Sequence, residues 1–341
     1  MTAATVLQEP LDLNGLARPG DHRYTHLITT LADGSTVGIP VIVLAGHGDG
    51  PRVLAIAGVH GDEMEGIVAL QEVAERLDPA ALRGTVVLIP VGNPPAFRAA
   101  RRRSPLDDLD LNRTFPGDPG GSPSQRLAYH LLHDYVLRAD FVLSLHSWSA
   151  PAVVVPYVEF PAGDGAVAGR SLAAARQLGL EFLRVSHWHP GLLVATAVRH
   201  GVPAVETEVG GLGISQPVTR ERYVEVVLNL LRYLRVVSDA PPAASPARVV
   251  RHVELATPVG GLLRPVRAIG DRVRPGDLIA TVCDLLGHVQ AELTSPLNGW
   301  LAMLRLCNSV DPGERVATLF EEIPDLADAG VPRPGGATAG Q

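Results

Sequence analysis

The stretch RVLAIAGVHGDEMEGIVALQEVAERL, residues 52–77, holds the pattern that indicates the fold class. Its first part is a continuous apolar run typical of a buried strand, and its last part has apolar residues at helical spacing. A turn rich in glycine and acidic residues joins the two parts and carries His60 and Glu63. We therefore expect a strand, a tight turn and a helix, with two polar side chains placed where the strand ends.

The alternation of strand and helix patterns continues well beyond this stretch. Further buried-strand patterns are GTVVLIPVGN at 84–93, ADFVLSLHS at 139–147 and VPAVETEVGG at 202–211. Apolar strands separated by helices indicate an α/β fold, with a mixed, largely parallel sheet flanked by helices. In such sheets, ligands bind beyond the carboxyl ends of the strands. The residues that end these strands are therefore the first candidates for a functional site.

The texture of the sequence changes after the last of these patterns. We expect an α/β domain over 1–237, a linker rich in Pro, Ala and Ser over 238–247, a small all-β module over 248–323 and a disordered tail over 324–341. The module resembles biotinyl or lipoyl carrier barrels, but the chain has no lysine, because all 29 basic residues are arginine. It therefore cannot carry either cofactor. We expect it to cover the mouth of a cleft in the first domain or to mediate oligomerisation.

The composition excludes several classes of function. The formal net charge of −7 is unlike the basic surface of a nucleic-acid-binding protein, and no apolar run is long enough for a membrane span. Two cysteines cannot build a disulfide framework, and the N-terminus lacks the apolar core of a signal peptide. The chain has no G-x-S-x-G elbow, which argues against a serine hydrolase. We expect a soluble, cytoplasmic protein that acts on small molecules.

Two histidines and a glutamate form a candidate metal site. His60 and Glu63 make a His-x-x-Glu pair after one strand pattern, and His146 ends the strand pattern at 139–147. Zinc in hydrolases takes three ligands from histidines and carboxylates and leaves one position for water. His-x-x-Glu by itself is a weak pattern, and an ordinary turn is the alternative interpretation. The glycine-flanked turn, with a second strand-end histidine available, favours a metal site.

The chain has 12 histidines, and most of them need no functional explanation. His130 and His133 lie three apart on a predicted helix, and we interpret them as surface or packing residues. His187 and His189 precede a predicted helix near the same edge of the sheet. We expect these two histidines to line the site rather than to bind metal.

The segment SPLDDLDLNRTFPG at 104–117 is long and lacks a regular pattern, which often accompanies function. It places Asn112 and Arg113 side by side, downstream of three successive arginines at 101–103. The arginine guanidinium can donate two parallel hydrogen bonds to a carboxylate, and asparagine adds an uncharged donor. We interpret the segment as a substrate-binding loop. The alternative is a solvated loop whose arginines pair with its own aspartates.

Two acids interrupt the apolar strand pattern VPAVETEVGG. Glu206 and Glu208 are two residues apart, so they face the same side of a strand. Burying acids in an apolar strand is costly, and a strand-end carboxylate that faces water can act as a general base. Glu208 is nearer the end of the strand and is the preferred candidate, with Glu206 next. The alternative interpretation is an exposed edge strand.

Four motifs occur in order along the chain, namely GVHGDE, DLNRTFPG, LHS and TEVGG. Together they resemble the succinylglutamate desuccinylase/aspartoacylase family, relatives of the zinc carboxypeptidases, over residues 24–235. The resemblance implies a zinc carboxypeptidase-like fold and one zinc ion per chain, held by His60, Glu63 and His146. It also implies that Glu208 is the general base, which activates the zinc-bound water and then protonates the leaving amine.

The resemblance also assigns roles in the substrate-binding loop. Asn112 and Arg113 would bind the substrate carboxylate. Arg102 would polarise the scissile carbonyl, with Arg101 and Arg103 left open as alternatives. The R-x-S-P-L-D and H-P-G segments are similar to those of the branch that deacetylates Nα-acetyl-diaminobutyrate, an intermediate of ectoine breakdown.

The expected function is that of a zinc-dependent amidohydrolase. It would remove an acetyl or succinyl group from an N-acyl amino acid or related small amine, such as Nα-acetyl-L-2,4-diaminobutyrate. A zinc carboxypeptidase acting on short peptides is the second hypothesis, and a non-catalytic metal- or ligand-binding protein is the third. The expected partner is a small-molecule N-acyl amino acid, with no nucleic acid and no membrane, and a homo-oligomer is left open.

Overall fold

The computed structural model describes residues 5–12, 19–163, 165–187, 189–240, 247–306 and 309–323. The expected linker falls largely on residues 241–246 and the expected tail on 324–341, which lie outside the described residues. The expected domain boundaries therefore stay predictions. Within the described ranges, no helix is long and apolar enough to cross a membrane.

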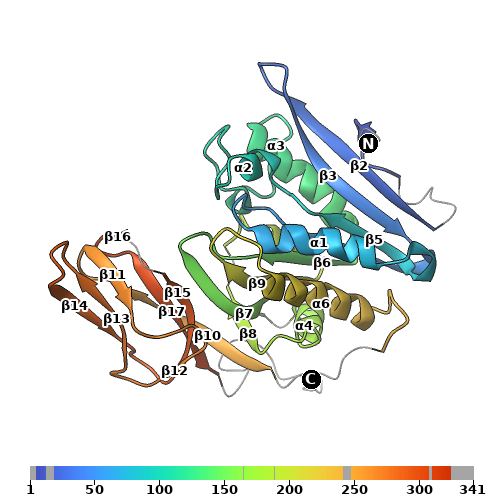
Figure 1. The fold of residues 1–341 in the computed structure, drawn as a ribbon. Coiled ribbons are helices and arrows are strands. Elements are labelled where there is room, and N and C mark those ends of the chain that lie inside the picture. The colour runs from blue at the N-terminus through green and yellow to red at the C-terminus, as the bar shows by residue number, and fades with distance from the viewer. Residues whose placement is uncertain are drawn as a thin grey trace, which may run out of the picture.

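The first part of the chain folds around a mixed sheet (Figure 1). Its strands are β1 (Thr5–Leu7), β2 (Gly20–Thr30), β3 (Thr36–Ala45), β4 (His47–Ile56), β5 (Arg83–Ile89), β6 (Phe141–His146), β7 (Ala152–Pro161), β8 (Phe182–Ser186) and β9 (Ala204–Gly211). In space they follow the order β1-β2-β3-β5-β4-β6-β9-β7-β8. β4 is parallel to β5 and β6, and β6 is parallel to β9, whereas β2–β3, β3–β5 and β7–β9 are antiparallel. The expected α/β fold with a mixed sheet is confirmed.

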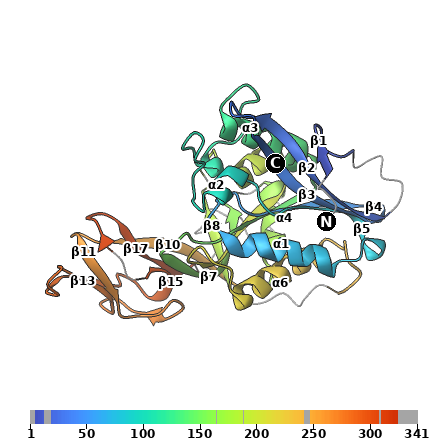
Figure 2. The same cartoon turned by 45° about the horizontal axis from the view of Figure 1, so that its top comes forward.

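Helices cover both faces of this sheet. They are α1 (Met64–Arg76), α2 (Pro94–Arg98), α3 (Pro123–His130), α4 (Ala166–Ala175), α5 (Leu193–Arg199) and α6 (Pro217–Tyr233), with short 3₁₀ or π turns at η2 (Pro79–Ala81), η3 (Leu111–Arg113), η4 (Leu131–Tyr135) and η5 (Val136–Arg138). In both views α1 and α6 lie side by side on one face (Figures 1 and 2).

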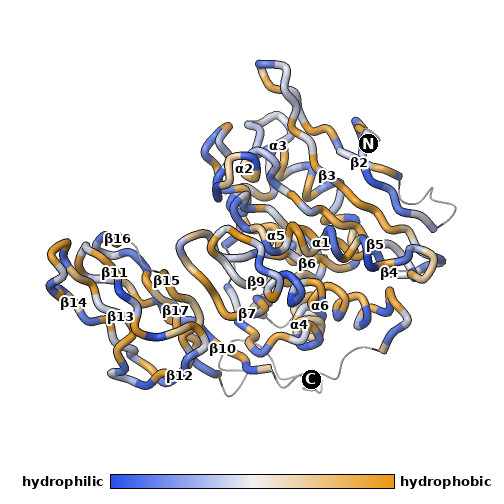
Figure 3. The backbone as a smooth tube through the Cα atoms, in the orientation of Figure 1, coloured by the Kyte–Doolittle hydropathy of each residue, from blue (hydrophilic) through white to orange (hydrophobic). Residues whose placement is uncertain are grey.

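The strand β4 shows why the central strands are apolar throughout. Val53 and Ala55 belong to the core that packs under α1 and α6, whereas Leu54 and Ile56 belong to the core that includes α3 and α5. Alternate residues of a strand face opposite sides, so a strand covered on both faces needs no polar positions. Hydrophobic residues accordingly gather around β6, α1 and α5 (Figure 3).

Beyond residue 247, the described residues form strands and turns. The strands are β10 (Arg248–Ala256), β11 (Gly261–Pro265), β12 (Arg272–Val273), β13 (Leu278–Cys283), β14 (Val289–Thr294), β15 (Gly299–Arg305), β16 (Ser309–Val310) and β17 (Arg315–Glu322). β10, β17, β15 and β12 extend the large sheet, because β10 pairs with β8 and β15 pairs with β7. β14, β13, β11 and β16 form a second sheet. The C-terminal strands are thus joined to the first part of the chain by backbone hydrogen bonds.

The loop between α2 and α3 is fastened to the N-terminus of α3 by Asp107. The Ser122 hydroxyl donates to Asp107 at 2.6 Å, and the backbone N–H and the hydroxyl of Ser124 each donate at 2.8 Å. Burial would raise the pKa of Asp107, but these donors outweigh burial and hold the pKa below its ordinary value. The charged Asp107 therefore stabilises the loop that carries Asn112 and Arg113.

We predict that Asp107→Asn lowers the free energy of unfolding at pH 7, and that this deficit shrinks as the pH falls below about 4. The lowered pKa sets the sign. Above the unfolded-state pKa the charged Asp107 stabilises the folded protein, and this contribution is lost as the pH falls through the folded-state pKa. Urea unfolding of both proteins between about pH 7 and pH 3 measures the deficit.

Asp108→Asn is the control for this experiment, because the neighbouring Asp108 side chain is 76% exposed. It should change stability little at any pH in the series. A deficit of the Asp107→Asn variant that stays constant with pH would contradict the prediction.

Candidate metal centre and active-site cleft

The turn after β4 packs His60 and Glu63 against the sheet. Two glycines make the turn feasible. Gly58 has a φ of +59°, and a Cβ on Gly61 would lie 2.0 Å from the carbonyl carbon of Ala96 in α2. Glu63 immediately precedes α1. His60 and Glu63 are only 2% and 4% exposed, so both polar side chains are held inside the protein.

His146 reaches the same place because β6 lies beside β4 and runs parallel to it. Nδ1 of His60 lies 2.6 Å from Glu63 Oε1, and Nδ1 of His146 lies 2.8 Å from Glu63 Oε2. One ligand atom from each of the three residues lies within 4.8 Å of the others. The hydroxyl of Tyr223 in α6 donates to the His146 carbonyl and ties this strand end to the helix. The structure thus brings the three expected metal ligands together.

The charges around His60, Glu63 and His146 favour a cation. Burial would raise the pKa of Glu63, but the imidazoles of His60 and His146 outweigh burial and hold that pKa below its ordinary value. Burial would lower the pKa of His146, but Glu206 and Glu63 outweigh it and raise that pKa to about 10. The first shift keeps Glu63 as a carboxylate, and the second favours positive charge at His146. Two imidazoles and a carboxylate are also a donor set that suits zinc, so the residues fit this metal.

Among the three successive arginines, Arg102 contacts the candidate metal ligands. Its Nε donates to Asp110 Oδ2 at 3.0 Å, and its Nη1 lies 3.7 Å from Glu63 Oε1. Arg101 and Arg103 instead donate to backbone carbonyls within the loop and form ion pairs with Asp108 at 3.8 Å and 3.9 Å, as the alternative interpretation of the loop expects for these two arginines. The contacts of Arg102 therefore support it over its two neighbours as the arginine that faces the candidate metal centre.

Asn112 and Arg113 lie next to the candidate metal centre in different environments. Asn112 is 2% exposed, and its Nδ2 donates to Glu206 Oε2 at 3.3 Å while its Oδ1 accepts from the backbone N–H of Leu193 at 3.0 Å. Arg113 is exposed, and its Nη1 donates to the Asn112 carbonyl at 2.8 Å. Arg113 therefore has donors left for a ligand, whereas the Asn112 amide is engaged at both ends.

The acids of β9 lie in the interior of the sheet. β9 runs between β6 and β7, so the interpretation of an exposed edge strand is wrong. His146 lies beside Glu208 in the β6–β9 register, and Tyr157 of β7 lies opposite Glu208. In the described part of the chain, Glu208 Oε2 is buried and has no hydrogen-bond partner. Burial raises the pKa of Glu208 well above its ordinary value, and the charge of Glu63 adds to this effect.

These side chains line one cleft of about 850 Å³. The expected residues on its wall are His60, Glu63, Arg102, Arg103, Asn112, Arg113, His146, His187, His189, Glu206 and Glu208. The described wall of the cleft does not include His130 or His133, and Nδ1 of His130 instead lies 2.7 Å from Asp134. The cleft is therefore lined by residues from the turn after β4, from the loop between α2 and α3 and from the ends of β6 and β9.

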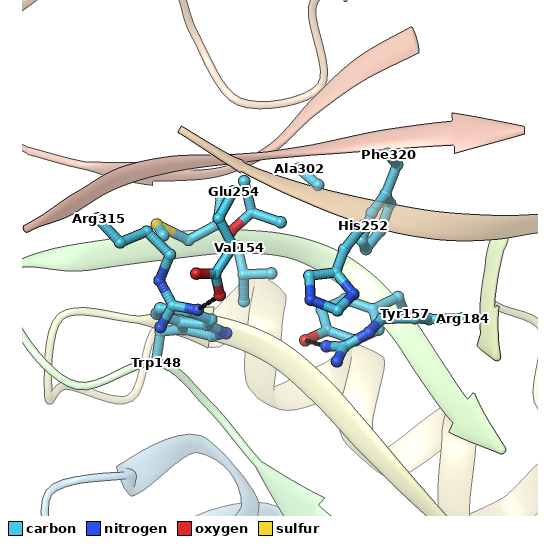
Figure 4. Close-up of a pocket in the computed structure, with 11 residues that line it drawn as sticks. Trp148, Val154, Tyr157, Arg184, His252, Glu254, Ala302, Arg315 and Phe320 are labelled. Atoms are coloured by element: carbon cyan, nitrogen blue, oxygen red, sulfur yellow. Dashed lines mark hydrogen bonds and ion pairs between the residues drawn. The ribbon is translucent and has the colours of Figure 1, made fainter. Parts of the chain in front are cut away.

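Several residues that line the cleft were not predicted from the sequence. The guanidinium of Arg315 in β17 lies 4.4 Å from the ring centre of Trp148 and donates to Glu254 (Figure 4). Glu159 on β7 pairs with Arg184 on β8 at 2.6 Å. Glu159 and Arg184 are each a single charged residue in an apolar strand pattern. The acids of β9 were singled out by the same signal, so the sequence could have indicated these two residues as well. Arg315 has no such signal, because charged residues are ordinary on partly exposed strands.

Comparisons of sequence match the chain to one family of proteins. A model of the succinylglutamate desuccinylase/aspartoacylase catalytic domain matches residues 49–234. An N-alpha-acetyl-L-2,4-diaminobutyric acid deacetylase from Halomonas elongata is 35% identical over 305 residues, which span 84% of this chain and 87% of that protein. A succinylglutamate desuccinylase from Burkholderia orbicola is 46% identical over 77 residues, which span 22% of each chain.

Solved structures share the fold over most of the chain. A succinylglutamate desuccinylase/aspartoacylase from Rhodobacter sphaeroides superposes with a TM-score of 0.83 at 29% identity, covering 92% of this chain and 98% of that one. The product-bound ectoine utilization protein EutE (DoeB) from Ruegeria pomeroyi superposes with a TM-score of 0.82 at 26% identity, covering 89% and 96%. The four motifs, the fold and the sequence matches thus agree, and the chain belongs to the succinylglutamate desuccinylase/aspartoacylase family and is an enzyme that hydrolyses amide bonds.

Proposed function

We propose that this enzyme is a zinc-dependent deacylase that removes the acyl group of an N-acyl amino acid. The observation that carries the proposal is the buried convergence of His60, Glu63 and His146 beside Glu208, whose Oε2 has no partner among the described residues. Three metal ligands beside a free carboxylate are the groups that amide hydrolysis by an activated water requires.

The residues around the metal ligands supply the proton transfers. A zinc ion, when bound, lowers the pKa of a water ligand to about 7 and polarises a carbonyl oxygen. Glu208 acts as the general base, which accepts a proton from the attacking water and passes it to the nitrogen of the leaving amine. Its position beside His146 in the β6–β9 register and its unpartnered oxygen support this role.

The arginines of the loop orient the substrate. Arg102 is held by Asp110 at 3.0 Å, so its guanidinium is fixed where it can donate to the scissile carbonyl oxygen as that oxygen gains negative charge. Arg113 supplies charged donors for the substrate carboxylate. The Asn112 amide donates one N–H to Glu206, and its second N–H supplies the neighbouring neutral donor. Fixing both ends of the substrate relative to the metal lowers the entropy cost of reaching the transition state.

Of the five arginines that line the described wall of the cleft, Arg184 and Arg315 are paired with acids, which favours an uncharged acyl group beside them. Arg184 pairs with Glu159 at 2.6 Å, and Arg315 pairs with Glu254 at 2.5 Å, so both cations are already neutralised. A succinyl group brings a second carboxylate that needs a cation, whereas an acetyl group does not. Together with the 35% identity to the Halomonas elongata deacetylase, this makes Nα-acetyl-L-2,4-diaminobutyrate the first substrate to test.

We predict that the purified enzyme holds about one zinc ion per chain and releases acetate from Nα-acetyl-L-2,4-diaminobutyrate. His60→Ala, Glu63→Ala and His146→Ala should lose metal and activity, because each removes a ligand. Glu208→Gln should keep the metal and lose activity, because it removes the base. Metal analysis and an acetate assay measure both properties, with N-succinyl amino acids and short peptides as competing substrates.

The outcomes of this experiment separate the parts of the proposal. An active Glu208→Gln enzyme would overturn the assignment of the base. Release of succinate, or cleavage of peptides in preference to acetyl amino acids, would overturn the choice of acyl group. A wild-type protein that binds no zinc after reconstitution and hydrolyses none of these compounds would overturn the proposed function.

We also predict that Arg102→Ala lowers kcat by about 100-fold or more, because it removes a donor to the oxygen that becomes negatively charged. Arg101→Ala is the matched control, since Arg101 donates to loop carbonyls and should be dispensable for the reaction. Steady-state kinetics with the same substrate compare the two variants. Equal losses in both would mean that the arginines act only by holding the loop.

A further inference from the structure

We propose that Glu206 is a positioning residue, which orients the imidazole of His146 so that its other ring nitrogen can bind metal. The inference rests on the proposed function, because it requires His146 to be a metal ligand. It assigns a role to an acid that lies inside the sheet, two residues from the candidate base.

Each histidine of the candidate metal centre lies between two carboxylates. The Nδ1 atoms of His60 and His146 face Glu63, at 2.6 Å and 2.8 Å. On the far side of each ring, His60 Nε2 lies 3.1 Å from Asp110 Oδ1, and His146 Nε2 lies 3.4 Å from Glu206 Oε2. A carboxylate on the far nitrogen of a ligating histidine fixes its tautomer and ring orientation and makes it a stronger ligand. Asp110 and Glu206 therefore lie on corresponding sides of the two rings, Asp110 as a hydrogen-bond partner of His60 and Glu206 at ion-pair distance from His146.

The oxygen of Glu206 that faces His146 is held in place by its neighbours. Glu206 is 5% exposed and lies beside Ser144 of β6 in the interior of the sheet. Nδ2 of Asn112 donates to the same Oε2 at 3.3 Å, and the Asn112 amide is fixed in turn by the backbone N–H of Leu193. The loop, β9 and α5 thus restrain one carboxylate oxygen next to His146.

The surroundings of Glu206 make its charge costly. Glu159 lies directly opposite Glu206 in the β7–β9 pair, and like charges in this position destabilise a sheet. Arg184 pairs with Glu159 at 2.6 Å and offsets its charge. In the described part of the chain, His146 is the residue that forms an ion pair with Glu206. A buried acid opposed by a second acid is a poor packing choice, and contact with a metal ligand explains its presence.

The same geometry separates the roles of the two acids of β9. The Glu206 oxygen contacts the ring nitrogen of His146 that points away from Glu63, so Glu206 acts through His146. Glu208 lies beside His146 with an oxygen that has no partner among the described residues, so it can act on water. Loss of Glu206 should therefore weaken metal binding, whereas loss of Glu208 should not.

Zinc affinity of the purified enzyme tests this inference. Competition with a chromophoric chelator gives the zinc dissociation constants of the wild type, Glu206→Gln and Asp110→Asn. Asp134→Asn is the matched control, because Asp134 also contacts a histidine, His130, at 2.7 Å but lies outside the cleft. We expect Glu206→Gln and Asp110→Asn to raise the dissociation constant about 10- to 100-fold, and Asp134→Asn to leave it unchanged.

Further measurements distinguish positioning from a general loss of structure. The thermal midpoint of the zinc-free Glu206→Gln protein should not fall below that of the zinc-free wild type. At saturating zinc, its KM should stay near the wild-type value while kcat falls. If Glu206→Gln does not fold, Glu206→Asp replaces it, and its shortened carboxylate should also weaken zinc binding.

Two outcomes would contradict this inference, and the experiment distinguishes them. Zinc binding by a folded Glu206 variant that is as tight as in the wild type and Asp134→Asn would overturn this inference alone, and the proposed function would stand. A wild-type enzyme that hydrolyses acyl amino acids without binding zinc would overturn both the metal assignment and the role of Glu206.

Discussion

The parallel register of β4, β6 and β9 is the constraint on which the candidate site depends. It brings three carboxyl ends to one edge of the sheet, so that the turn bearing His60 and Glu63 meets His146 and Glu208. Side chains alternate between the two faces of a strand, so a shift of one residue in β6 would move His146 to the opposite face. Close packing of these strands under helices on both sides, and the hydrogen bond from Tyr223 to the His146 carbonyl, oppose such a shift.

The fold also has to accommodate several charged side chains in its interior. Unpaired charges inside a protein cost several kcal/mol each, so buried acids need partners. Glu63 lies between two imidazoles, and Glu159 pairs with Arg184. Among the described residues Asp62, Glu65 and Glu208 each have a buried oxygen without a hydrogen-bond partner, and of these three Glu208 lines the cleft. An acid that bears this cost at the wall of a cleft is a candidate for chemistry rather than for packing.

The C-terminal strands take part in the cleft as well as in the sheet. Arg315 of β17 stacks on Trp148, which follows His146 by two residues, and it is held there by Glu254 of β10 (Figure 4). The pairing of β10 with β8 and of β15 with β7 places these strands against the catalytic part of the chain. The wall of the cleft therefore includes residues from two parts of the chain that are far apart in sequence.

The sequence by itself determined the α/β fold class, the strand–turn–helix unit at 52–77 and the family, because these depend on periodic patterns and short motifs. It also singled out His60, Glu63, His146 and Glu208, since each lies at the end of an apolar strand pattern. Only the tertiary structure decided which arginine of the run contacts the candidate metal ligands, which nitrogen of each imidazole faces Glu63, and that Arg315 reaches the cleft. These features depend on which strands become neighbours and how side chains turn, and contacts between distant residues leave no periodic mark in the chain.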